Sequence, residues 1–242
     1  MQDAFQVLIL IGRPAAGKSE VIDFLKKLGD DERRAQLHIA PFEEIDDFVW
    51  VWQLFEDDDV RERLGRERLN TTRDHHFNDP FLWNFLIGKI NLEFDKKLAR
   101  DPDFLSTHTV VVEFSRGGEN GFAEAFSYLS DNILRRAGIV YVGVPYEESL
   151  RRNRRRARPG QESSILYHSL QDSKMEALYK TNDWEKLSGG QPEGFIKIKD
   201  VQVPFAVFQN EPEKTDNPAK LGPALQIVFG RLWALTNANG GK

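Results

Sequence analysis

The sequence lacks cysteine altogether, although it is 242 residues long. This absence excludes disulfides, thiolate metal sites and cysteine nucleophiles, and it suits a reducing compartment. Long apolar runs are also missing: no stretch approaches the roughly 18 residues of a membrane span, so we expect no membrane segment. A strand pattern already begins at Gln6, which leaves no room for a signal peptide. These absences predict a cytoplasmic protein.

Basic residues are also not in excess. Acidic residues outnumber basic ones by 38 to 33, and the formal net charge is −5. The basic residues are nevertheless concentrated at 151–158, which contains six arginines and no acid. An acidic chain with one basic segment is not typical of a nucleic-acid binder, so we expect a single anion-handling site. An RNA-binding arm is the alternative for this segment, because it also needs clustered arginine.

The strongest motif lies at 12–19, which spells Gly-Arg-Pro-Ala-Ala-Gly-Lys-Ser and fits G-x-x-x-x-G-K-[ST]. The apolar run at 6–11 predicts a buried strand before it, and apolar residues at helical spacing predict a helix over 19–28 after it. In such a unit the backbone N–H groups and the helix N-terminus bind phosphate. A chance Gly-Lys-Ser loop is the alternative, and the flanking strand and helix argue against it.

On these residues the chain resembles the P-loop NTPase superfamily. The resemblance implies ATP and Mg²⁺ as cofactors, with Lys18 reaching the β- and γ-phosphates and the Ser19 hydroxyl ligating the metal. It also implies that the whole loop binds the nucleotide: Gly12, Arg13, Pro14, Ala15, Ala16, Gly17, Lys18 and Ser19. The motif identifies a nucleoside triphosphate and leaves the acceptor open.

Strand and helix patterns alternate along the remainder of the chain. Strand patterns occur at 6–11, 37–40, 107–114, 139–144 and 205–208. Helix patterns occur at 19–28, 79–98, 122–133, 146–158, 163–179 and 218–235, and 41–54 indicates helix or turn. This alternation predicts one α/β domain over 1–242: a three-layer α/β/α P-loop fold with a mainly parallel, five-stranded sheet. We interpret 56–79 as an insertion and 146–180 as a lid segment.

Ligands bind beyond the carboxyl ends of parallel strands, so polar residues there are candidates for the site. Glu113 occupies the place where the superfamily has a second acidic residue that orients Mg²⁺, although Asp is more usual there. Arg116 resembles the acceptor-phosphate arginine of small nucleotide kinases. The alternative for Glu113 is a solvated carboxylate at a strand end. The alternative for Arg116 is an arginine that lies at the surface or pairs with a carboxylate.

Two further groups are candidates for the acceptor. Either Asp46 or Asp47 could act as general base or hold the acceptor hydroxyl, and the alternative is an acid pair at a helix N-terminus. Arg73, with His75 and His76, is a weaker candidate for acceptor contacts, because exposed polar residues are the rule in loops.

The arginine-rich segment resembles the lid helix of nucleoside and nucleotide kinases, whose arginines close over the transferred phosphoryl group. Planar guanidinium groups match the charged oxygens of that transition state. If Leu150 faces the body of the protein, Arg154 shares its helix face. This predicts Arg154 and Arg158 as catalytic residues, with Arg151 and Arg155 beside them.

One pentapeptide points to another branch. Residues 187–191 spell Leu-Ser-Gly-Gly-Gln, the signature of ABC-transporter ATPases, which works by opening a helix toward a phosphate. Here Pro192 and a strand-like stretch follow, so we interpret the pentapeptide as a turn. By resemblance alone, Asn210, Glu211 and Thr215 occupy a place that often contacts adenine, and a plain loop is the alternative.

These features together predict an ATP-dependent phosphotransferase that moves the γ-phosphoryl group to a small-molecule acceptor such as a nucleoside, a nucleotide or a similar metabolite. Two alternatives remain open. One is a P-loop ATPase that acts as a switch, including the ABC-like case, and the other is a nucleotide-binding module without transfer.

Overall fold

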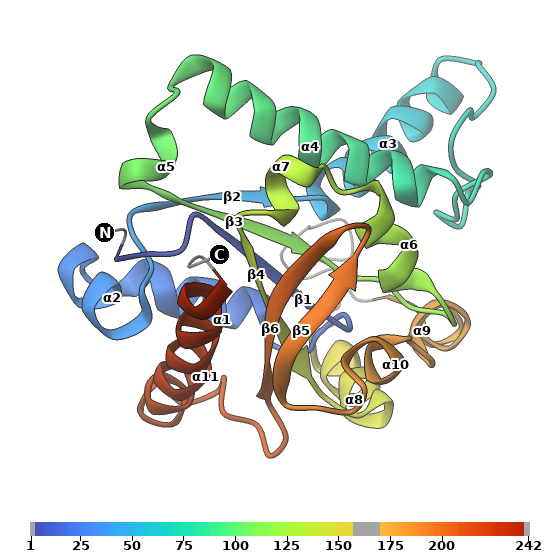
Figure 1. Cartoon of the computed structure of the whole chain (residues 1–242). Helices are drawn as coiled ribbons and strands as arrows, with labels where there is room; N and C mark the ends of the chain where they lie inside the picture. The colour runs from blue at the N-terminus through green and yellow to red at the C-terminus, as the bar shows by residue number, and fades with distance from the viewer. Residues whose placement is uncertain (1–2, 157–169, 240–242) are drawn as a thin grey trace.

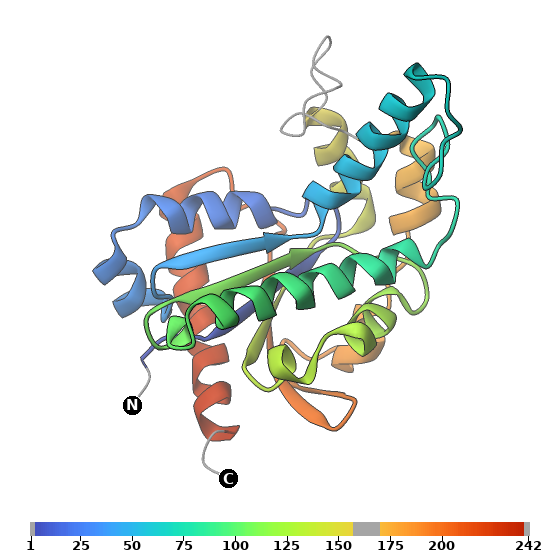
Figure 2. The same cartoon turned by 90° about the horizontal axis from the view of Figure 1, so that it is seen from above.

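The structure is a computed structural model that describes residues 3–156 and 170–239. Its centre is one six-stranded sheet with helices on both faces (Figures 1 and 2). The strands lie in the spatial order β2 (Phe42–Asp46), β3 (Thr109–Phe114), β1 (Val7–Gly12), β4 (Ala137–Gly143), β6 (Val201–Gln209) and β5 (Glu193–Ile198). All neighbouring pairs are parallel except β5 with β6. The predicted three-layer α/β fold is therefore confirmed.

The core lies on both faces of β1, the central strand, whose six residues are all buried. Successive side chains of a strand point to opposite faces. Accordingly, Ile9 and Ile11 pack into one apolar cluster, whereas Leu8 and Leu10 pack into the other. This burial on both faces explains why the strand is continuously apolar in sequence.

The helices are divided between the two faces of the sheet. One face is covered by α1 (Lys18–Lys27), α2 (Asp30–Leu37) and α11 (Pro218–Asn239). The other is covered by α4 (Leu82–Arg100), α5 (Phe104–Thr107), α6 (Gly121–Tyr128), α7 (Asp131–Leu134) and α10 (Trp184–Ser188). Three further helices, α3 (Phe48–Arg63), α8 (Tyr146–Arg156) and α9 (Asp172–Tyr179), stand beyond the carboxyl ends of the strands (Figure 2). No helix among the described residues is long and apolar enough to cross a membrane.

The sheet differs from the prediction at its two edges. The expected strand at 37–40 is absent: α2 ends at Leu37, and the edge strand is β2, where helix or turn was expected. In β2 only Ile45 is fully buried. The strand therefore needs few apolar residues, and its sequence lacks the alternation of apolar and polar residues that would reveal it. The sixth strand, β5, lies in a stretch at 195–208 whose strand pattern is interrupted by Asp200 and Pro204; only 205–208 was counted, and the structure divides the stretch into β5 and β6.

Two helical predictions also change. Residues 56–63, expected to belong to an irregular insertion, continue α3 as far as Arg63. The helix pattern at 122–133 divides into α6 and α7, because Ser130 accepts a hydrogen bond from the Ile133 N–H and begins a new helix. Of the helix expected at 163–179, the described part is α9, and 163–169 lie outside the described residues.

Candidate active site

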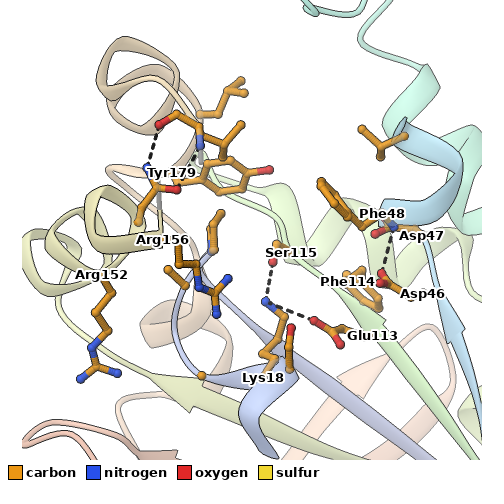
Figure 3. A pocket seen from close by; sticks show the side chains of 18 of the residues that line it. Lys18, Asp46, Asp47, Phe48, Glu113, Phe114, Ser115, Arg152, Arg156 and Tyr179 are labelled. Carbon is orange, nitrogen blue, oxygen red and sulfur yellow. Dashed lines mark hydrogen bonds and ion pairs between the residues drawn. The ribbon is translucent and has the colours of Figure 1, made fainter. Parts of the chain in front are cut away.

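The glycine-rich loop joins β1 to α1, as predicted. Gly17 has φ +113°, and a Cβ there would lie 2.6 Å from Asn210 Nδ2, so both backbone conformation and space require glycine. The Lys18 side chain is buried, and its Nζ donates to Ser115 Oγ at 2.7 Å and to the Arg13 carbonyl oxygen at 3.3 Å (Figure 3). The lysine is thus held in place by groups of the protein.

A cavity of about 600 Å³ opens over this loop. Its walls come from the loop itself, the ends of β2 and β3, and the helices α3, α8 and α9. The predicted residues that line it are Pro14, Ala15, Gly17, Lys18, Ser19, Asp46, Asp47, His75, Glu113, Arg155 and Thr215. Residues predicted from six separate chain segments therefore meet in one place.

Three carboxyl groups lie at the floor of the cavity (Figure 3). Strand register places Asp46 beside Glu113, whose Oε1 is 3.8 Å from Lys18 Nζ. Burial, with the nearby charges of Glu113 and Asp47, raises the pKa of Asp46 to about 7. Burial likewise raises the pKa of Glu113 and lowers the pKa of Lys18. Such crowding of buried acids favours the arrival of an additional cation or the uptake of a proton.

The predicted metal ligands Ser19 and Glu113 both line this floor. A hydroxyl and a carboxylate are hard oxygen donors, and Mg²⁺ prefers such ligands, so the donor set fits this ion. Residues 3–156 and 170–239 contain no cluster of three or more His, Asp or Glu side chains that could hold a metal ion by itself. A metal here would therefore depend on nucleotide phosphates and water for most of its ligands.

Arg116 does not line the cavity, contrary to the expectation that it holds an acceptor phosphate. It is only 5% exposed, and its Nη1 lies 2.7 Å from Asp47 Oδ2. It also donates to the carbonyl oxygens of Ser115 and Trp83, and its guanidinium lies over the Trp83 and Phe114 rings. The carboxylate-paired alternative is the one that the structure supports.

We expect Arg116→Met to lower the free energy of unfolding by about 3 kcal/mol, because it leaves the buried Asp47 carboxylate without its partner. Urea denaturation at pH 7 measures this change. As a control, Asp47→Asn combined with Arg116→Met removes both charges and should recover part of the loss. Unchanged stability with a raised KM for the acceptor would contradict this result and restore a binding role.

The arginine helix presents a different face from the one predicted. Its buried residues include Arg152, which donates to the carbonyl oxygens of Ala16 and Asn210 and so braces the phosphate-binding loop. Arg156 lines the cavity and pairs with Glu20 at 2.7 Å. Arg154 is not brought to the cavity: it is exposed and pairs with Asp172. The prediction failed because the short side chain of Ser149, rather than Leu150, packs against the loop at the Pro14 carbonyl oxygen.

Other predicted residues lie elsewhere. Arg158 lies outside the described residues. Arg151 is exposed beside Glu148, and Arg73 is exposed and pairs with Glu62. His75 lines the cavity, whereas His76 does not.

Hydrogen bonds between side chains and backbone carbonyl oxygens hold both ends of the glycine-rich loop. Gly12 ends β1, and Arg13 donates to the carbonyl oxygens of Val144 and Tyr179. Ala16 offers its carbonyl oxygen to Asn210 Nδ2 at 2.8 Å. Asn210 therefore braces the loop, and of the three residues given an adenine role, Thr215 alone lines the cavity.

The Leu-Ser-Gly-Gly-Gln pentapeptide stands at the end of a helix. α10 ends at Ser188, and Gly189 is its left-handed C-cap. The backbone N–H groups that an ABC signature aims at phosphate belong to a helix N-terminus. The ABC-like alternative therefore has no structural support, and the interpretation as a turn agrees with the structure.

Sequence reasoning missed several residues that line the cavity. Ser115 follows β3 directly, and this position at a strand end was a usable signal. The aromatic and basic residues of the upper walls had no such signal, because only the packing of α3, α4 and α9 brings them together: Phe48, Phe55, Trp83, Lys174 and Tyr179.

The spatial strand order 2-3-1-4, with the glycine-rich loop between β1 and α1, decides the type of fold. The chain has the fold of the P-loop kinases. No protein-family model and no curated protein matches the chain.

Solved structures similar to this chain include a shikimate kinase and a sugar kinase at low identity. A shikimate kinase from Acinetobacter baumannii has 15% identity and a TM-score of 0.41 over 99% of this chain and 97% of its own. A sugar kinase from Janibacter sp. has 12% identity and a TM-score of 0.36 over 96% and 98%. A protein from Thermus thermophilus has 15% identity and a TM-score of 0.46 over 98% of both chains.

Proposed function

We propose that the protein is an ATP-dependent phosphotransferase that acts on a small-molecule acceptor. The observation that carries this proposal is the shared cavity: Lys18 and Ser19 face the same space as Asp46 and an apolar wall. A site for hydrolysis alone needs no such wall, because water is the acceptor. Its volume of about 600 Å³ lies within the range of small-molecule sites.

In the proposed reaction the acceptor hydroxyl oxygen attacks the γ-phosphorus of ATP. The bond from that phosphorus to the β–γ bridging oxygen breaks, ADP leaves, and the hydroxyl proton passes to the Asp46 carboxylate. Lys18 and the loop N–H groups hold the phosphates, and a bound Mg²⁺, held by Ser19 with Glu113, would offset charge on them. Asp47 is held by Arg116 and positions the start of α3.

An acceptor screen with ATP and Mg²⁺ tests this function. Coupled detection of ADP gives the rate, and ³¹P NMR of the products identifies a new phosphate ester. We expect ADP release that depends on the acceptor. ADP release at the same rate without any acceptor would instead identify an ATPase.

Two arginines of α8 provide a matched pair of variants. Arg156→Ala is expected to lower kcat by about 10²-fold or more, because the cavity-lining guanidinium can move from Glu20 to the developing charge. Arg154→Ala should leave kcat within about twofold, because that side chain is exposed and pairs with Asp172. Steady-state kinetics of both variants measures the contrast. A larger loss from Arg154→Ala would contradict the arrangement seen here.

A further inference from the structure

We propose, building on the proposed function, that the acceptor is a neutral alcohol whose body is a flat aromatic or heteroaromatic ring. This assignment excludes acceptors that carry a phosphate, and it excludes open polyols. It rests on three observations: an aromatic wall, an opposing wall that is anchored to the phosphate-binding loop, and the engagement of the nearby cations by protein groups.

The aromatic wall is built by α3, the loop that follows it, and the start of α4. Phe48, Val51 and Phe55 lie one helical turn apart on α3 and line the cavity, together with Trp83. The His75 ring stacks on Phe55 with centroids 4.7 Å apart and planes at 6°. A flat ring fits such a surface, because offset stacking adds about 0.5–1.5 kcal/mol to the burial of apolar area.

α9 forms the opposing wall with Leu178 and Tyr179 (Figure 3). Burial raises the pKa of Tyr179 to about 12, so its phenol stays neutral. The end of α9 is fixed from below: Arg13 donates to the Tyr179 carbonyl oxygen at 3.0 Å. A Cβ at Gly117 would lie 1.9 Å from the Leu178 carbonyl oxygen, so the helix rests directly on that glycine. The wall formed by α9 is therefore anchored to the glycine-rich loop.

The basic residues around this space are held by protein groups. Arg116 is withdrawn behind the wall and pairs with Asp47. Lys174 of α9 donates to the Asp74 carbonyl oxygen, which links the two walls. At the nucleotide side, Arg155 pairs with Glu213 and Arg156 with Glu20.

A carboxylate, in contrast, lines the cavity where the reacting hydroxyl would lie. Asp46 supplies it, whereas the neighbouring Asp47 is paired with Arg116. A second phosphate on the acceptor would meet Asp46, and Arg156, the cation that can leave its partner, is assigned to the transferred phosphoryl group, so the extra charge costs binding energy. A neutral alcohol avoids that repulsion, and its ring occupies the aromatic wall that a polyol would leave without apolar contact.

A matched set of probes tests this inference: thymidine, thymidine monophosphate, benzyl alcohol and ribose. Calorimetry with a non-hydrolysable ATP analogue and Mg²⁺ measures binding, and ³¹P NMR with ATP measures transfer. We expect thymidine and benzyl alcohol to bind at least tenfold more tightly than the monophosphate and ribose. Tighter binding of the monophosphate or ribose, or no preference among the four, overturns the inference.

Two variants locate the ring on the wall. Phe55→Leu keeps the apolar volume and should weaken thymidine binding by roughly 3- to 10-fold, since it removes the ring against which His75 is stacked in the wall. Phe81→Leu is the control, because Phe81 is 51% exposed and lies outside the cavity lining. Equal effects of the two variants would overturn the placement.

The two proposals fail in different ways. Ring alcohols that bind preferentially without becoming phosphorylated would refute the phosphotransferase and leave the ring specificity standing. Phosphorylation of the monophosphate or ribose in preference to ring alcohols would refute the ring specificity and leave the phosphotransferase standing.

Discussion

Asp46→Asn is expected to lower kcat for phosphoryl transfer by about 10²- to 10⁴-fold, the usual contribution of a general base. The carboxylate stands beside Glu113 in the strand register and lines the same cavity as Lys18. Asn keeps the size of the side chain and can still accept the hydrogen bond from the Phe48 N–H that Asp46 accepts at 2.9 Å. The start of α3 should therefore persist, so the loss reports proton transfer.

The pH profile of the unaltered protein checks the same assignment. Burial raises the pKa of Asp46 to about 7, so the carboxylate is the base above that pH and is protonated below it. Transfer should therefore decline as the pH falls through about 7, and this limb should disappear in Asp46→Asn.

The control for Asp46→Asn is Glu43→Gln, which changes an exposed acid on the same strand that pairs with Lys97 outside the cavity. It should leave both kcat and the pH profile unchanged. A full-rate Asp46→Asn enzyme would exclude this residue as the base and move attention to Glu113, which is also buried and also has a raised pKa.

Lys18→Ala is expected to lower ATP-dependent transfer by about 10³-fold. The ammonium group is buried, contacts Ser115 Oγ, and lies 3.8 Å from Glu113. A bound triphosphate would replace these contacts with charged oxygens. The other cation of the loop, Arg13, does not line the cavity, because it donates to the backbone oxygens of Val144, just after β4, and of Tyr179 in α9. Its removal therefore takes away the cation nearest the β- and γ-phosphates.

ATP titration by calorimetry and single-turnover transfer together separate binding from chemistry in Lys18→Ala. The matched control is Lys27→Ala, at the exposed end of the same helix, where the side chain pairs only with Asp23. Lys27→Ala should behave as the unaltered protein. Transfer at full rate by Lys18→Ala would refute a P-loop phosphotransfer mechanism.

The buried elements of the fold could be predicted because their causes are local. The apolar run of β1 and the helical spacing of Val21, Ile22 and Leu25 in α1 identify themselves by period. The edge strands could not be recognised in the same way. β2 and β5 each have one solvated side, so hydrogen bonding to a neighbour, rather than their own composition, makes them strands.

The site divides along the same line. The loop at 12–19 and Glu113 were predicted to lie at the cavity because each follows or ends a strand that the sequence reveals, and parallel strands bring their carboxyl ends together. Asp46 and Asp47 were expected several residues after a strand at 37–40, and the structure places them at the end of β2 instead. Arg116 was predicted to hold an acceptor phosphate and Arg154 to contact the transferred phosphoryl group, and neither lines the cavity. Whether an arginine faces a ligand or a carboxylate depends on its neighbours in space, and Asp47 and Asp172 are those neighbours.

The sequence by itself thus determined the unit of strand, glycine-rich loop and helix, the acid at the end of β3, and the class of the fold. These follow from local backbone demands and from strand ends that topology must bring together. The tertiary structure alone decided which arginines face the cavity and what its upper walls are made of. Both depend on side chains from α3, α8 and α9, and only packing fixes how those helices are rotated.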